Sequence, residues 1–446
     1  MRKLRAMTLS GLISLAASVL ASGTLAADVQ IISPKPGAEL TGKVDVVARV
    51  TPPTGQIIGA VIVQGETGDM VRLVPGPPDT YSAAIDTARL PNGKQSLVVI
   101  ESVKGLTPSR FRHADDAWES PFRQFEAEVS VTVRNPYRFF WGDLHAHTSY
   151  SDGVLTPRDA YQYARDKSKL DFFAVTDHSQ CLTFDEYADV IAQANRCDAP
   201  GKFVALWGAE STEGTGHMNF YLAPTPRMPE ARDEIYQSLG KMRVLAEFNH
   251  PSLNSPPDQG WKDDYEGFHY SPVADPYVAL VEVREAEEEA AYIALLNAGW
   301  HVGAAANDDT HEANWGSANW TVALARELTR TGITDAILSR RTYSTADRNL
   351  QLLFTLDGED MGAQIARKAG TYSVAVAVED PDAAETVDAI DLFVDGTITQ
   401  TATPKLTKYT WTVPVELSAG KHYVFVRVTQ SGDKKSWSSP IWVSAY

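Results

Sequence analysis

Histidines and carboxylates recur in four short segments along the middle of the chain, with a glutamate and a histidine between the second and third segments. These are Asp143–Gly153, Thr176–His178, Asn249–Pro251 and Asp309–His311, with Glu210 and His217 in between. Imidazole nitrogens and carboxylate oxygens are ligands for divalent transition metals. So many of them, most at the end of an apolar run, predict a site for more than one metal ion and hence a metal-dependent hydrolase.

Most of these residues follow short apolar runs that are typical of β-strands: Phe139–Leu144, Asp171–Thr176, Phe203–Trp207, Val244–Phe248 and Val302–Ala306. Helical patterns such as Pro157–Lys169 and Ala286–Ala298 lie between several of them. This alternation predicts a parallel α/β architecture, in which functional side chains gather at the carboxyl ends of the strands. His145 and His147 are two residues apart, so on a strand they face the same way, as two ligands of one ion require.

A single histidine near a strand end is more often a structural or surface residue than a ligand. We interpret His113, His269, His301 and His422 in that way. A paired motif followed by a third strand-end histidine, a glutamate, a His-Pro and a final Asp-x-His would rarely align by chance.

In their order along the chain, these segments resemble the motifs of the polymerase-and-histidinol-phosphatase (PHP) superfamily of metallohydrolases. The resemblance covers the middle of the chain and fills every expected ligand position. It implies a distorted (β/α)7 barrel that holds two or three divalent ions, with zinc, manganese and iron all compatible with nitrogen and oxygen ligands. The flanking domains point to the secreted branch that includes carbaryl-type ester hydrolases.

The resemblance also implies a ligand set. By position, the ligands are His145, His147, Glu210 and Asp309 for the first ion, Glu210, His217 and His250 for the second, and Asp152, His178 and His311 for the third. Glu210 would bridge the first two ions. Some branches of the superfamily have histidine at the position of Asp152. An aspartate keeps a ligand there, but its carboxylate oxygen is a harder donor atom than an imidazole nitrogen.

Such ions would support hydrolysis without a side-chain nucleophile. A divalent ion lowers the pKa of bound water to about 7, and two ions about 4 Å apart can position the hydroxide and stabilise the departing oxygen. The predicted function is cleavage of an ester bond, either a phosphoester or a carboxyl or carbamate ester, by metal-bound hydroxide. The alternative is a non-catalytic exported protein that binds metal or another ligand on the same scaffold. The complete ligand set favours the enzyme.

Four polar residues adjoin the proposed ligands. Asp143 and Asp177 precede ligand histidines and could take part in catalysis by orienting imidazoles. They could equally cap strand ends. Asn307 and Asp308 precede the last ligand pair and could contact substrate or bound water.

Arg284 is a further catalytic candidate because it follows the apolar run Val278–Val283. A guanidinium matches the geometry of phosphate, so Arg284 could bind an anionic group of the substrate. An ion pair with Glu282 or Glu285 is the structural alternative.

The first residues predict export. Met1–Arg5 is basic, Leu9–Leu20 is apolar, and Thr24–Ala26 ends in small residues suited to cleavage. This is the pattern of a secretory signal peptide, so we expect the mature chain to begin near Ala27 or Asp28 and to be periplasmic or secreted. No later segment is apolar and long enough to span a membrane.

The charge and the cysteines restrict the partners. A formal charge of −17 and a pI near 5.0 argue against a nucleic-acid partner and leave a small-molecule ester as the expected substrate. The oligomeric state is not predicted. Cys181 and Cys197 could form a disulfide in an oxidising compartment, and two free thiols are the alternative.

The flanks of the chain show β patterns on both sides of the α/β region. We therefore expect an α/β fold: a distorted (β/α)7 PHP-type barrel flanked by N- and C-terminal β-sandwich-like domains. The expected parts are a signal peptide (1–27), an immunoglobulin-like β domain (28–136), a PHP-type hydrolase domain (137–347) and a C-terminal β domain (348–446).

Overall fold

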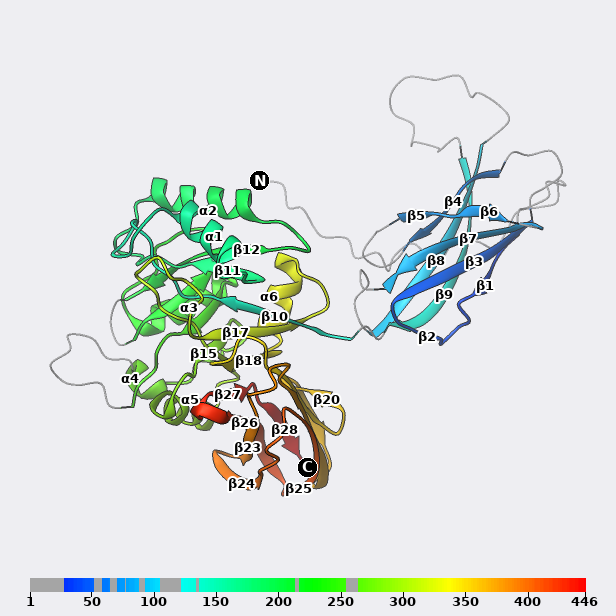
Figure 1. Ribbon diagram of the computed structural model, residues 1–446. Helices are drawn as coiled ribbons and strands as arrows, with labels where there is room; N and C mark the ends of the chain where they lie inside the picture. The colour runs from blue at the N-terminus through cyan, green and yellow to red at the C-terminus, as the bar shows by residue number, and fades with distance from the viewer. Residues whose placement is uncertain are drawn as a thin grey trace. The chain divides into compact units, whose positions relative to one another are not determined.

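The computed structural model describes residues 28–51, 58–64, 70–76, 78–87, 93–104, 122–133, 136–212, 216–253 and 264–446. The chain divides into two compact units, Met1–Pro136 and Tyr137–Tyr446 (Figure 1). The segment predicted to be a signal peptide lies outside the described residues. The predicted boundary between residues 347 and 348 falls within the second unit and stays a prediction.

The first unit contains two β-sheets, ordered β1-β3-β7-β6 and β2-β9-β8-β4-β5. Their strands are β1 Asp28–Ser33, β2 Glu39–Leu40, β3 Lys43–Thr51, β4 Ile58–Gln64, β5 Met70–Arg72, β6 Val74–Gly76, β7 Thr80–Asp86, β8 Gly93–Lys104 and β9 Phe122–Val133. Alternate valines of β3 and β9, such as Val46 and Val131, are buried in one core that both sheets share. The period of two residues therefore gives each sheet one inward face.

The second unit begins with α/β structure. Its elements are β10 Arg138–Asp143, α1 Pro157–Asp166, β11 Phe172–Val175, α2 Phe184–Cys197, β12 Val204–Ser211, β13 Met218–Tyr221, α3 Arg232–Met242, β14 Leu245–Phe248, α4 Tyr265–Phe268, β15 Val278–Glu282, α5 Ala286–Ala298, β16 Gly303–Ala305, β17 Trp320–Ala325, α6 Arg330–Leu338 and β18 Thr342–Thr345. The strands β11, β14, β15 and β16 are completely buried, which explains why their sequences are mostly apolar.

The strands of this region are partly parallel. β10, β11 and β12 run parallel to one another, and so do β14, β15 and β16. β13 lies between the two groups and is antiparallel to both β12 and β14, while β17 and β18 extend the other edge in antiparallel fashion. The expected parallel α/β pattern is therefore interrupted. A regular succession of seven strand–helix units is not evident among the described residues, because no helix separates the described ends of β12 and β13.

Local sequence signals explain the helix boundaries. Thr156 and Thr183 form capping boxes with Asp159 and Glu186, which satisfy the first backbone N–H groups of α1 and α2. α5 covers the range expected from the sequence, and it ends because Gly299 adopts φ 104°.

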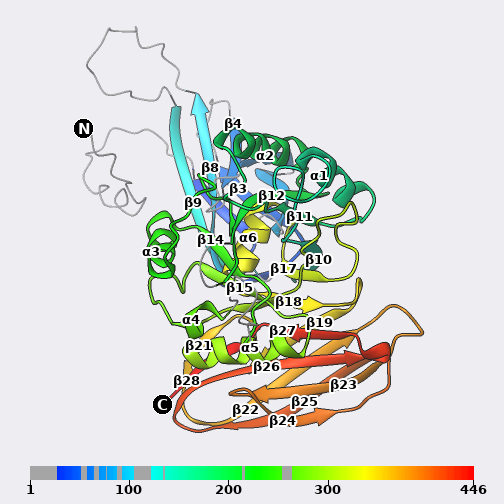
Figure 2. The same ribbon diagram turned by 90° about the vertical axis from the view of Figure 1, so that its left-hand side faces the viewer.

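Ten strands complete the second unit: β19 Gln351–Leu356, β20 Glu359–Asp360, β21 Gln364–Arg367, β22 Gly370–Glu379, β23 Val387–Val394, β24 Thr397–Ala402, β25 Lys408–Leu417, β26 Gly420–Gln430, β27 Lys435–Ser438 and β28 Ile441–Ala445. One sheet is ordered β20-β19-β22-β25, and β23, β24 and β26–β28 belong to the same sheet as β10–β18 because β27 pairs with β18. The two layers enclose a common apolar core. Figure 2 shows α5 lying along β26, between the strands of the α/β region and the C-terminal strands.

Candidate metal centre

Strand direction brings the proposed ligands to one edge of the sheet. His145 and His147 follow β10, His178 follows β11, His250 follows β14 and Asp309 follows β16. Isolated parallel bridges continue this alignment beyond the strands, from Ala146 to Thr310 and from His178 to Glu210.

His217 reaches the same edge because β13 is antiparallel to its neighbours. Ser211 near the end of β12 pairs with Met218 at the start of β13. An antiparallel strand begins where its parallel neighbours end, so His217, one residue before β13, lies beside Glu210.

All nine residues that the sequence assigns as ligands are brought together, and we call them the nine-residue cluster. They form three overlapping groups, each with ligand atoms within 4.8 Å of one another: His145, His147 and Glu210; Glu210, His217 and His250; and His147, Asp152, His178 and His311. Asp309 adjoins the first group, with its Oδ1 atom 3.2 Å from His145 Nε2 and 3.1 Å from His147 Nε2. His147 belongs to two groups, whereas the sequence assigned it to the first ion alone.

Glu210 is the centre of this arrangement. Its Oε1 atom lies 3.2 Å from His145 Nε2, 3.3 Å from His217 Nδ1 and 3.7 Å from His250 Nε2. Its Oε2 atom lies 2.8 Å from His178 Nδ1. The carboxylate thus touches residues of all three groups.

The third group is more open to solvent than the others. Asp152 lies 3.3 Å from both His178 and His311, and its side chain is 56% exposed, whereas that of Glu210 is 1% exposed. A small molecule in solution could therefore approach the nine-residue cluster from the side of Asp152.

Neighbouring imidazoles favour the ionised form of two carboxylates of the cluster, Glu210 and Asp309. Burial acts to raise the pKa of Glu210, but the neighbouring imidazoles, His145 foremost, hold this pKa well below its usual range. The pKa of Asp309 is lowered by the same two histidines that it contacts, against the effect of burial. Ionised carboxylates are the form that binds cations.

The donor set fits divalent transition metals. Six imidazoles and three carboxylates supply nitrogen and oxygen ligands, and the described part of the cluster contains no sulfur ligand. Glu210 Oε2 and His178 Nδ1 are buried without a hydrogen bond of good geometry, although they are close together. A cation between them would satisfy both lone pairs.

Asp143 and Asp177 contact backbone and hydroxyl groups rather than imidazoles. Asp143 accepts hydrogen bonds from the backbone N–H of His145 at 3.1 Å and of Gly316 at 3.2 Å. Asp177 accepts from the N–H and hydroxyl of Thr148, both at 2.7 Å, and from Ser151 Oγ at 2.6 Å. These contacts fit the strand-end capping interpretation.

Arg284 is engaged mainly with Glu288. Its Nη2 atom lies 2.6 Å from Glu288 Oε1 and 3.7 Å from Glu282 Oε2. The ion-pair interpretation therefore fits these contacts, with Glu288 in the place where Glu285 was expected. The arginine side chain retains 22% exposure, and its role toward a substrate stays a prediction.

Sequence reasoning missed a buried polar network behind the nine-residue cluster. Glu282 Oε1 lies 3.1 Å from His145 Nδ1, and the amide of Asn307 donates to both Glu282 and Glu247 at 3.0 Å. The hydroxyl of Tyr221 donates to Glu247. Burial, together with the charge of Glu282, raises the pKa of Glu247 to about 8. A glutamate within the apolar run Val244–Phe248 was the available signal.

Of the two alternatives for the cysteines, the structure has two free thiols and no disulfide between Cys181 and Cys197. Cys181 precedes the N-terminus of α2 and is exposed, whereas Cys197 ends α2 and is buried. A helix of 14 residues is about 20 Å long, far beyond the roughly 7 Å between Cα atoms that a disulfide allows.

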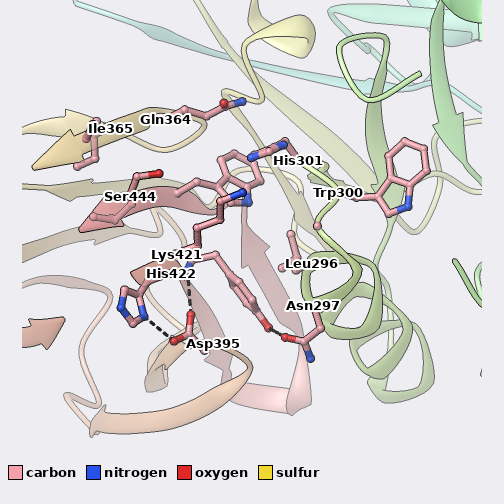
Figure 3. Close-up of a pocket in the computed structure, with 15 residues that line it drawn as sticks. Leu296, Asn297, Trp300, His301, Gln364, Ile365, Asp395, Lys421, His422 and Ser444 are labelled. Carbon is pink, nitrogen blue, oxygen red and sulfur yellow. Dashed lines mark hydrogen bonds and ion pairs between the residues drawn. The ribbon is translucent and has the colours of Figure 1, made fainter. Parts of the chain in front are cut away.

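The structure also contains a cavity of about 630 Å³ where the end of α5 meets β21, β26 and β28 (Figure 3). His301 and His422 line it, but none of the nine proposed ligands does. His422 is bonded to Asp395 at 2.7 Å, and Tyr423 donates to Asn297 across the cavity wall at 2.9 Å. This contact fits the structural interpretation of His422.

The known proteins that match this chain have low sequence identity to it, and no family model matches the chain. An uncharacterised protein of Chlamydia muridarum (strain MoPn / Nigg) is 21% identical over 367 residues, which cover 71% of this chain and 59% of that relative. The chain therefore spans less than two thirds of the relative's length.

Among solved structures, a two-domain protein from Bacteroides vulgatus that contains a "predicted PHP-like metal-dependent phosphoesterase" is 16% identical, with a TM-score of 0.41. The match covers 69% of this chain and 95% of that one. Fibronectin(III)-like modules of Clostridium thermocellum CbhA are 18% identical, with a TM-score of 0.17, and cover 24% of this chain and 94% of theirs. None of the described helices is both long and apolar enough to cross a membrane.

Proposed function

We propose that this chain is an exported, PHP-type metal-dependent hydrolase that cleaves an ester bond. One observation carries the proposal: three overlapping groups of ligand-type side chains meet at one sheet edge, and Glu210 contacts residues of all three. Divalent ions held there would activate water and stabilise negative charge on the departing oxygen.

The residues of the chain have separate tasks in this proposal. His145, His147 and Asp309 would hold the first ion, and His217 and His250 the second, with Glu210 placed between them. Asp152, His178 and His311 would hold the third ion on the exposed side, where a substrate can arrive. The buried base of the cluster excludes solvent from Glu210.

A closed PHP-type barrel is part of the proposal. Thr342 Oγ1 donates to the carbonyl of Ala304 and Thr321 Oγ1 to that of Ala306, each at 3.0 Å. These bonds link the end of the strand order at β16 to β17 and β18, which supports a sheet that curves back on itself.

The substrate class is proposed as a small ester, either a phosphoester or a carboxyl or carbamate ester of the carbaryl type. The sequence charge of −17 disfavours nucleic acid as the substrate. The proposed periplasmic or secreted location rests on the first 26 residues, and the intact mass of the exported protein tests it directly.

Metal analysis combined with a panel of nitrophenyl phosphate, phosphodiester, acetate and carbamate esters tests the function. We expect more than one transition-metal ion per chain, and hydrolysis of at least one ester class. Glu210→Ala and His250→Ala should lose most of this activity, because they remove ligands. His422→Ala should retain it, because His422 lines the separate cavity.

Absence of stoichiometric metal in the purified protein would refute the proposal. Bound metal without hydrolysis of any ester would favour the non-catalytic metal-binding alternative.

A further inference from the structure

We propose that Glu282 is a positioning residue that fixes the ring tautomer of His145, holds the backbone of His250, and thereby sets the metal affinity of the first two groups. This inference rests on the proposed function, because it concerns the same ions. Glu282 itself touches neither the exposed side of the nine-residue cluster nor the approach to it, since its side chain is fully buried.

The two carboxylate oxygens of Glu282 have different partners. Oε1 lies 3.1 Å from His145 Nδ1 and accepts from Asn307 Nδ2 at 3.0 Å. Oε2 accepts from the backbone N–H of His250 at 2.6 Å. One buried carboxylate therefore joins the segments that follow β10, β14 and β16.

The contact with His145 determines which ring nitrogen can bind a metal. A carboxylate only accepts hydrogen bonds, so the proton of a neutral His145 ring lies on Nδ1. The lone pair is then on Nε2, the atom that lies 3.2 Å from both Glu210 Oε1 and Asp309 Oδ1. Partners of this kind keep a ligand histidine in the tautomer that coordinates.

The contact with His250 holds a strained backbone. His250 has φ 30°, in the left-handed region that residues other than glycine rarely occupy. Such a conformation persists only where neighbouring groups over-determine it. Glu282 is one of those neighbouring groups, because it accepts a short hydrogen bond from the backbone N–H of His250. This hydrogen bond fixes the backbone position from which the imidazole of His250 extends.

Asn307 connects Glu282 to the segment before His145. Its Oδ1 atom accepts from the backbone N–H of Leu144 at 2.8 Å, while its Nδ2 atom donates to Glu282. A displacement of the Glu282 carboxylate would therefore move both the ring of His145 and the loop that carries it.

Glu282→Gln tests the inference with little change in volume. A glutamine has one acceptor oxygen where the carboxylate has two. If the amide oxygen of Gln faces His145, its NH2 group faces the backbone N–H of His250, and two donors meet. If the amide is flipped, its NH2 group faces Nδ1 of His145 and favours the tautomer with the proton on Nε2. Either orientation loses one of the two contacts.

The measurement is zinc affinity of the metal-stripped full chain, by competition with a chromophoric chelator, with the thermal melting of the metal-free protein recorded in parallel. We expect Glu282→Gln to weaken zinc binding about 10- to 100-fold, the usual effect of losing such a partner. Glu282→Asp keeps two acceptor oxygens and should bind zinc more tightly than Glu282→Gln.

Glu247→Gln is the matched control. Glu247 is equally buried and accepts a hydrogen bond from the same Asn307, but its hydrogen-bond partners, Tyr221 and Asn307, are not proposed ligands. Glu247→Gln should keep the zinc affinity within about threefold of the wild-type chain. This substitution alters the contacts to Tyr221 and Asn307 but removes no contact to His145 or His250.

Unchanged zinc affinity in Glu282→Gln, or an equal loss in Glu247→Gln, would overturn the inference while leaving the proposed function standing. A wild-type chain that binds no zinc would instead remove the proposed function.

If Glu282→Gln does not fold, the wild-type protein itself decides. In zinc-loaded protein with 15N-labelled histidine, we expect a slowly exchanging proton on Nδ1 of His145, identified by its absence in His145→Asn. Zinc-loaded protein without that proton would overturn the inference.

Discussion

Asp152 and Asp177 show how two aspartates near the same histidines have different surroundings. Asp177 is buried and accepts three hydrogen bonds from Thr148 and Ser151. Asp152 is half-exposed and faces His178 and His311. Partial burial acts to raise the pKa of Asp152, but these imidazoles lower it overall. We therefore propose that Asp177 contributes to stability and that Asp152 binds metal.

This proposal predicts that alanine substitution of Asp177 mainly reduces stability, whereas that of Asp152 mainly weakens metal binding. Asp177→Ala leaves a buried backbone N–H and two hydroxyls without their acceptor, so it should reduce the free energy of unfolding by about 1–3 kcal/mol. Asp152→Ala should change it by less than about 0.5 kcal/mol, as is usual for exposed side chains, but should weaken metal binding. Urea unfolding of metal-free protein and zinc titration measure the two effects. Equal destabilisation by both would contradict the assignment.

At the scale of elements, the sequence predicts helices and strands that have a clear apolar pattern, but it does not predict the antiparallel strand β13. α5 and most strands of the ligand-bearing region were predicted close to their observed bounds, because apolar runs and helix patterns are local signals. β13 was missed because four buried residues carry no period that distinguishes a strand from a loop. Its antiparallel direction depends on pairing with β12 and β14, which no local pattern encodes.

The same limit applies to the candidate site. The residues of the nine-residue cluster stand out in the sequence because His and Asp recur after apolar runs. Glu282 and Glu247 do not, because each is a single acid within a strand and its partners come from distant segments. The interpretation of Glu282 as a plain ion-pair partner of Arg284 overlooked a closer contact, with His145.

Near the start of β26, the His422–Asp395 pair predicts a pH-dependent contribution to stability. Burial acts to lower the pKa of His422, but hydrogen bonds to Asp395 and to the carbonyl of Ser418 raise it overall. Since the pKa is higher in the folded state than in the unfolded state, the stabilisation is complete below about pH 6.5 and is lost as the pH rises through the folded-state pKa.

His422→Ala should therefore reduce the free energy of unfolding more at pH 6 than at pH 9, as measured by urea unfolding across this range. In an Asp395→Asn background, the difference between the two pH values should shrink, because the charged partner is gone. An effect of His422→Ala that grows with pH would contradict the direction of the pKa shift.

At the scale of the whole molecule, the C-terminal strands are continuous with the region that carries the candidate site. β27 pairs with β18, and α5 packs on β26 through Glu289 and Arg427, whose atoms lie 2.8 Å apart. Tyr292 and Phe425 are in aromatic contact across the same boundary, with ring centroids 5.4 Å apart. One apolar core contains Trp300 from the α/β part together with Trp437 and Trp442 from the C-terminal strands.

This shared core predicts that residues 137–446 unfold as a single cooperative unit. A chain that lacks the first unit should fold, bind zinc with unchanged affinity and melt in one transition, because no residue of the nine-residue cluster comes from that unit. A chain that ends at residue 347 should not fold stably. It would leave Tyr292, Trp300 and the edge of β18 exposed, and each large aromatic that loses its burial costs about 1.5–3 kcal/mol, against a total stability of about 5–15 kcal/mol. Circular dichroism during heating and limited proteolysis measure both outcomes. If residues 137–347 alone melted cooperatively and bound zinc, the C-terminal strands would be an independent domain, and the boundary expected from the sequence would also be a boundary of folding.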